Sequence, residues 1–130
     1  MIPKYRVWHH ELGRLMSVKC MFFQDSEIEE FELNDALMND YITAYPDEIE
    51  LMQSTGLFDR NGKEIFEGDI LDYRGRKALV RWHGSYASFI YRFVDEPHKR
   101  KAEWKPLYLA YMKCEIIGNV YENTELLEVI

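Results

Sequence analysis

The chain has 130 residues, about the length of one domain. Apolar residues make up 47% of it and charged residues 30%, as in soluble globular proteins, and no apolar run approaches the ~20 residues that a membrane-spanning helix needs. These values exclude a helical membrane protein, and we expect no membrane partner. The first residues also lack the continuous apolar stretch of a secretion signal, so we expect a cytoplasmic protein.

The net charge of −7 is unevenly spread along the chain. Residues 25–52 carry ten acidic residues and no basic one, whereas residues 74–105 carry nine basic residues and three acidic ones. Oppositely charged segments either face each other, within one subunit or between subunits, or serve separate partners. The simpler interpretation is that both are solvated surfaces of one soluble domain.

The N-terminal residues predict a β-hairpin. Residues 4–8 alternate between polar and apolar side chains, and residues 15–23 are rich in apolar and aromatic ones. Gly13, in the segment between them, is free to adopt the positive φ that a tight turn needs.

The acidic segment at residues 25–46 has two interpretations. Asn34 is suited to cap a short helix with apolar residues on one face. Residues 28–33 are equally suited to an edge strand whose glutamates discourage unwanted pairing. We expect a strand, followed by a short helix or an irregular loop.

After residue 48, short strands alternate with turns. The pair Asn61-Gly62 is a strong turn signal, because it adopts positive φ at little cost. A charged loop is expected at residues 95–103, and Asn123 is expected to cap a final helical turn. Strands are predicted at residues 49–55, 65–66, 70–73, 78–82, 88–94, 107–111 and 115–121. This spacing predicts a small barrel or roll, in a fold that is all-β or β-rich α+β.

Three blocks of the sequence resemble the YopX family of phage and prophage proteins. Residues 55–70 (TGLFDRNGKEIFEGDI) resemble its signature, residues 4–8 (KYRVW) its opening, and residues 116–127 (IIGNVYENTELL) its closing block. Thr124 stands where the family usually has proline, and both residue types suit the first position of a helix. The blocks span nearly the whole chain in the family's order.

The resemblance implies a phage- or prophage-encoded, cytoplasmic protein of no established activity. It also implies a C-terminal SH3-like β-roll. We therefore expect an N-terminal β-rich region with the acidic segment at residues 1–52, and the roll at residues 53–130, joined in one compact chain.

The simplest interpretation of the signature block is a structural role. Its glycines and turn residues separate apolar residues that can pack inside a small barrel. Four of its polar residues are candidates for a ligand groove: Asp59, Lys63, Glu67 and Asp69. Side chains of this type also commonly bond to turn backbones. Glu67 and Asp69 resemble a pair of catalytic carboxylates, but the glycine between them favours a bend.

The sequence contains few features of a catalytic site. The chain has no nucleophile elbow, dinucleotide-binding turn or phosphate-binding loop. Cys20 and Cys114 are far apart and are interpreted as reduced packing residues, and His9, His10 and Glu11 lack the spacing of a metal site. We expect no catalytic residue, no metal and no cofactor.

The basic segment combines cations with aromatic residues, which is typical of small β-barrels that bind nucleic acid. The alternative is that the aromatic residues form the core and the cations lie on solvated hairpin tips, which the sequence pI of about 5.1 also favours. The candidate residues for binding nucleic acid or a protein partner are Arg74, Arg76, Lys77, Arg92, Lys99, Arg100, Lys101 and Trp104.

These observations favour a non-enzymatic accessory or interaction module that forms a homo-oligomer. The acidic segment of one subunit would dock near the basic segment of another, and a host or phage protein is a further candidate partner. The first alternative is a nucleic-acid-binding barrel, and the second is a small hydrolase or lyase with its carboxylate site at Glu67 and Asp69.

Overall fold

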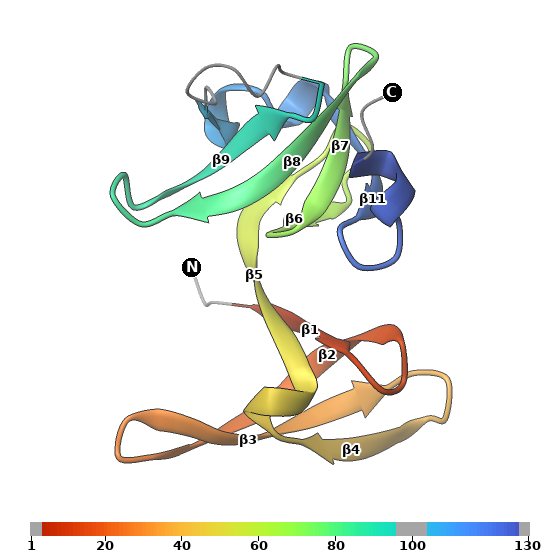
Figure 1. Cartoon of the computed structure of the whole chain (residues 1–130), viewed down its shortest axis with the longest axis vertical. Helices are drawn as coiled ribbons and strands as arrows, with labels where there is room; N and C mark the ends of the chain where they lie inside the picture. Colours follow the sequence, from red (N-terminus) through yellow and green to blue (C-terminus); the bar gives the residue numbers. More distant parts are fainter. Residues whose placement is uncertain (1–3, 96–103, 128–130) are drawn as a thin grey trace. The chain divides into compact units, whose positions relative to one another are not determined.

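The structure is a computed structural model that describes residues 4–95 and 104–127. The described residues form eleven β-strands and four short 3₁₀ helices, with no α-helix among them (Figure 1). This confirms the all-β class. No helix in these two ranges is long and apolar enough to cross a membrane.

The chain divides into two compact units, which we call unit 1 (residues 1–53) and unit 2 (residues 54–130). Strand β5 (Ile49–Phe58) begins in unit 1 and ends in unit 2. Each unit has its own apolar cluster.

Unit 1 is an antiparallel sheet in the order β4-β3-β2-β1-β5. One face carries its buried cluster, because the strands alternate and residues such as Val7, Met16 and Leu33 point to the same side. The expected N-terminal hairpin is confirmed by the pairing of β1 with β2. The strands before β5 are β1 (Tyr5–His9), β2 (Arg14–Gln24), β3 (Glu27–Asp35) and β4 (Asp40–Ala44), and the 3₁₀ helix η1 (Pro46–Glu48) precedes β5.

The strand expected in the acidic segment is confirmed as β3, but the helix suggested after it and its suggested place at the sheet edge are wrong. No helix follows Asn34, because its side chain donates across the sheet to Ser17 Oγ (3.0 Å) and the chain turns into β4. Strand β3 is also not an edge strand, since it pairs with β2 on one side and β4 on the other. The glutamates of β3 therefore lie within a sheet, and β4 is the edge.

Unit 2 contains a five-stranded antiparallel sheet in the order β10-β9-β8-β7-β11. Strand β6 pairs with the end of β5. The described strands form an open sheet with β10 and β11 at its edges, not a closed barrel. Its elements are β6 (Glu64–Phe66), β7 (Asp69–Tyr73), β8 (Arg76–His83), β9 (Ser88–Phe93), β10 (Lys105–Pro106), η2 (Leu107–Leu109), η3 (Tyr111–Lys113), β11 (Cys114–Asn119) and η4 (Thr124–Leu127).

The strand expected at residues 107–111 is instead a pair of 3₁₀ helices. The amide of Ala110 donates to Leu107 O (2.9 Å), and that of Lys113 donates to Ala110 O (2.9 Å). Leu107 and Ala110 are buried three residues apart, which is the 3₁₀ repeat, whereas a strand would bury every second residue.

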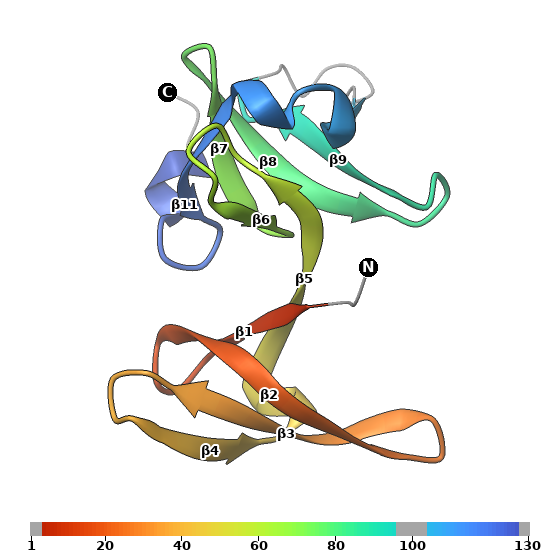
Figure 2. The same cartoon turned by 180° about the vertical axis from the view of Figure 1, so that it is seen from behind.

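The final helical turn is confirmed as η4. Asn123 stands at its start, where its carbonyl accepts the amide of Leu126 (3.0 Å), while its side-chain oxygen accepts the amide of Asn119 (3.1 Å). Figure 2 shows unit 2 from behind, with η4 beside the end of β11.

Candidate functional site

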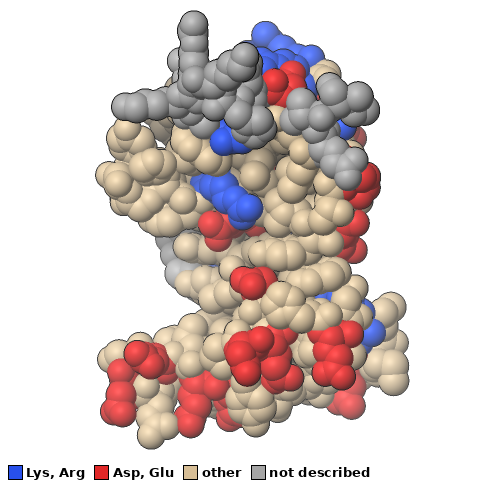
Figure 3. Space-filling view, in the orientation of Figure 1, with Lys and Arg blue, Asp and Glu red and all other residues tan. Residues whose placement is uncertain are grey.

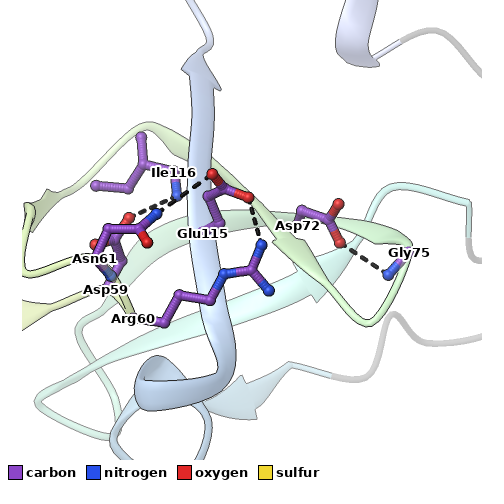
Figure 4. A network of polar contacts seen from close by, with 7 residues as sticks. All are labelled: Asp59, Arg60, Asn61, Asp72, Gly75, Glu115 and Ile116. Atoms are coloured by element: carbon purple, nitrogen blue, oxygen red, sulfur yellow. Dashed lines mark hydrogen bonds and ion pairs between the residues drawn. The ribbon is translucent and has the colours of Figure 1, made fainter.

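The signature turn is organised by the Asp59 carboxylate, which is 6% exposed. Oδ1 accepts the amides of Asn61 and Lys63, both at 2.9 Å, and Oδ2 accepts the amide of Ile116 in β11, also at 2.9 Å (Figure 4). Burial raises the pKa of Asp59, but the three amides and the nearby Lys63 outweigh it, so its pKa lies below the ordinary value. Both oxygens of Asp59 are therefore used to hold the turn.

Two neighbours of Asp59 also fasten the turn to β11. The Arg60 amide donates to Cys114 O (2.9 Å), and its guanidinium lies 2.5 Å from Glu115 Oε2. The Asn61 side chain donates to the other oxygen of Glu115 (3.3 Å). Figure 4 shows these side chains converging on Glu115. Together with the bond from Ile116 to Asp59, these contacts join the signature to β11, in which the closing block begins.

The second turn of the signature surrounds Gly68, whose φ of +87° favours glycine. The Gly68 amide donates to Val80 O, and its carbonyl accepts the amide of Val120, both at 3.0 Å. Asp69 is buried and accepts the amide of Phe66 (2.8 Å), while Glu67 accepts the amide of Trp82 (3.3 Å).

The four groove candidates therefore lie in two turns, Asp59 with Lys63 and Glu67 with Asp69. Three of them bond to backbone amides through their carboxylates, and the fourth, Lys63, is exposed. These contacts explain the residues as turn formers. The groove stays a prediction.

The closing block has a structural centre at Asn119, which is 6% exposed. Its side-chain oxygen accepts the amides of Tyr121 (3.0 Å) and Glu122 (2.9 Å), and its nitrogen donates to Glu122 Oε1 (2.8 Å). A Cβ on Gly118 would lie 2.5 Å from Asn123 Oδ1, so the glycine is needed for the close approach of that side chain. Sequence reasoning identified the block without these roles, because they depend on contacts between β11 and the following turn.

Two hydroxyl residues of β5 were not singled out from the sequence. Ser54 Oγ donates to Glu64 Oε2 (2.5 Å) and accepts the Gly56 amide (3.1 Å). Thr55 Oγ1 donates to Ile65 O (2.7 Å) and accepts the Leu57 amide (3.1 Å). They stabilise the irregular pairing of β5 with β6, where the register shifts.

The basic candidates lie on different sides of the unit 2 sheet. Arg76 lies on the core side, with its guanidinium 3.7 Å from the centre of the Phe93 ring and 2.9 Å from Asp95 Oδ1. Its hydrogen bond lowers the pKa of Asp95 below the ordinary value. Lys77, one residue further along β8, lies on the opposite side, because successive strand residues alternate.

Arg92 shares the face of Lys77, since it pairs with Leu79. Its guanidinium lies 5.6 Å from the centre of the Trp104 ring, so these two candidates are brought together. Arg74 is exposed in the β7–β8 turn, and Lys99, Arg100 and Lys101 lie outside the described residues.

The aromatic residues of this segment divide between core and surface. Tyr91 and Phe93 are buried in the apolar cluster of unit 2. Trp82 and Tyr86 are exposed near the β8–β9 turn, where Trp82 packs on Phe89 at 5.0 Å and Tyr86 on His83 at 4.4 Å.

The surroundings of His9 and Cys114 bear on metal and thiol chemistry in the described ranges 4–95 and 104–127. This part of the chain holds no group of three or more His, Cys, Asp or Glu residues that could bind a metal ion. His9 Nδ1 accepts the amide of Leu12 (3.1 Å), which is a turn contact. Burial raises the pKa of the Cys114 thiol to about 11, so this thiol is protonated at neutral pH.

Comparisons with known proteins give a family and a fold. The family model described as YopX protein matches residues 4–128. The crystal structure of protein EF1440 from Enterococcus faecalis is similar, with 27% sequence identity, a TM-score of 0.66, and coverage of 98% of this chain and 99% of that one. A comparison with curated proteins gives no match.

Proposed function

The chain belongs to the YopX family, as its sequence blocks indicate, and we propose that it is a non-enzymatic interaction module that assembles with further copies of itself. We place it among phage- or prophage-encoded accessory proteins that act in the cytoplasm of a bacterial host. The proposal depends mainly on how charge is divided between the two units.

The whole net charge of the chain lies in unit 1. This unit has 11 acidic and 4 basic residues, a net charge of −7, whereas unit 2 has 12 of each and is neutral. In the space-filling view, the part that holds β1–β4 displays many acidic and few basic side chains (Figure 3). An excess of one sign on one unit favours contact with a surface of the opposite sign.

Ion pairs within the described part of unit 1 balance only a few of these acids. Arg14 pairs with Asp35, and Lys19 Nζ lies 3.7 Å from Glu32. With 4 basic residues against 11 acidic ones, unit 1 cannot balance its own charge. The basic segment of a second copy supplies the opposite charge.

Light scattering after size exclusion tests this proposal at tens of micromolar protein. At about 50 mM salt we expect a mass that is a multiple of 15.6 kDa, and at about 500 mM salt a shift toward the monomer, because salt screens exposed charges. A monomer at low salt would contradict the proposal.

Nucleic-acid binding is the second candidate function, supported by the contact between Arg92 and Trp104 with Lys77 on the same face. A cation beside an aromatic ring suits a phosphate and a stacked base. Titration of fluorescent single- and double-stranded DNA and RNA at two salt concentrations tests it. Binding that weakens with salt and is lost in Lys77→Glu/Arg92→Glu would support it, and no binding at low salt would exclude it.

A hydrolase or lyase is the least supported alternative. Glu67 and Asp69 each accept a backbone amide, and these bonds account for both carboxylates as parts of a turn. We therefore assign them no catalytic role.

A further inference from the structure

The β2–β3 hairpin carries apolar side chains into solvent. We call residues 21–30, at its tip, the arm. Phe23 pairs with Ile28, and Met21 pairs with the buried Phe31, so the core side of the sheet continues along the arm. Phe23 is nevertheless 62% exposed, and Phe22 on the opposite side is 46% exposed. Figures 1 and 2 show the tip extending beyond the neighbouring strands of unit 1.

The arm is acidic as well as apolar. It contains Asp25, Glu27, Glu29 and Glu30, and no basic residue. The register shift between Phe22 and Phe23 leaves Glu29 without a cross-strand partner, as an extra residue in β3. A shallow pocket of about 270 Å³ lies beside it, lined by Gln24, Asp25, Glu27, Ile28 and Glu29.

Unit 2 has a surface of the complementary kind on η2 and η3, which we call the 3₁₀ patch. Three large apolar side chains are exposed there within five residues: Tyr108 (63%), Leu109 (68%) and Met112 (69%). Lys113 is exposed beside them, and residues 104–114 include Lys105 and no acidic residue. A grouped apolar surface of this kind marks an interaction site more often than single exposed residues do.

We propose that the arm of one copy of this chain docks on the 3₁₀ patch of a second copy. Each surface is apolar, and their charges are opposite, so the contact would bury apolar area while pairing glutamates with lysines. A contact between two arms would bring acidic residues together, and a contact between two 3₁₀ patches would bring lysines together. The contact therefore joins two different surfaces. It rests on the proposed self-association and places the contact on η2 and η3, directly after the basic segment in the sequence.

Sedimentation velocity with variants of each surface tests the inference. The arm variant is Glu27→Lys/Glu29→Lys, and the patch variant is Met112→Glu/Lys113→Glu; all four side chains are exposed. Each variant alone should sediment as a monomer at a concentration where the wild type associates. An equimolar mixture should associate again, because the new lysines of one variant face the new glutamates of the other.

Two truncations test the apolar part of the contact without changing charge. Phe23→Ala and Leu109→Ala should each weaken self-association about tenfold or more, as expected for an exposed side chain that becomes buried in an interface. Circular dichroism confirms that each variant is folded. The matched control, Glu11→Lys/Asp47→Lys, makes the same charge change on exposed residues of unit 1 outside the arm and should weaken association less than the arm variant does.

The outcomes separate this inference from the function it rests on. Wild-type association that persists in both the arm and the patch variants would overturn the inference and leave the proposed self-association intact. Failure of the mixture to associate, with both variants folded and monomeric, would also overturn it. A wild type that is monomeric at low salt would overturn both.

Discussion

The Asp59 carboxylate shows how one buried side chain can hold two distant parts of the sequence together. It accepts two amides of its own turn and one of β11, more than fifty residues away. We predict that Asp59→Ala lowers the free energy of unfolding by about 3 kcal/mol, because buried amides lose their acceptor. Urea denaturation followed by circular dichroism measures this. Asp47→Ala, at an exposed aspartate, should change it by less than about 0.5 kcal/mol.

The same carboxylate should make stability depend on acid. The folded-state pKa of Asp59 lies below its ordinary value, so its contribution is complete above about pH 4 and is lost as the pH falls through the folded-state pKa. We predict that Asp59→Asn flattens the loss of unfolding free energy below about pH 4. Equal slopes for wild type and variant would contradict this.

Gly118 and Asn123 should behave as a coupled pair. A methyl group at residue 118 would collide with the Asn123 side chain, which accepts the Asn119 amide. Gly118→Ala should therefore cost about 1–3 kcal/mol of unfolding free energy, and less when Asn123→Ala is already present. A double-mutant cycle in urea measures the coupling. Additive costs would show that the two side chains do not interfere.

At the scale of elements, the 3₁₀ helices give the clearest test of the fold. Leu107 is fully buried and Leu109 is 68% exposed, although a strand would point both to the same side. Leu107→Ala should cost about 2–5 kcal/mol of unfolding free energy, and Leu109→Ala less than about 0.5 kcal/mol. Similar costs for the two substitutions would favour a strand.

The sequence predicts elements well where a local pattern determines them. Strand β1 alternates and the Asn61-Gly62 turn has its own chemistry, so both follow from neighbouring residues. Residues 107–111 are nearly all apolar, so no alternation distinguishes a strand from a helix there. The partners of β3 lie on two other strands, and no local pattern reveals that it is an interior strand.

In the candidate site, too, local residue types predict some features, whereas others depend on contacts between distant residues. The turn residues of the signature were identified from their types, but the long-range bond from Asp59 to Ile116 was not. The basic segment looks continuous in sequence, yet alternation along β8 places Arg76 and Lys77 on opposite sides of the sheet. A run of basic residues in the sequence therefore does not by itself predict one binding face.

At the scale of the whole molecule, the proposed self-association depends on opposite charges meeting between copies of the chain. Carbodiimide crosslinking of a mixture of ¹⁵N-labelled and unlabelled protein tests this most directly, because it joins carboxylates to amines that are already in contact. We predict mixed-isotope peptides that join acids of residues 25–50 to lysines of unit 2, and Glu27 or Glu29 to Lys113 among them. Crosslinks found only within single copies would contradict the account.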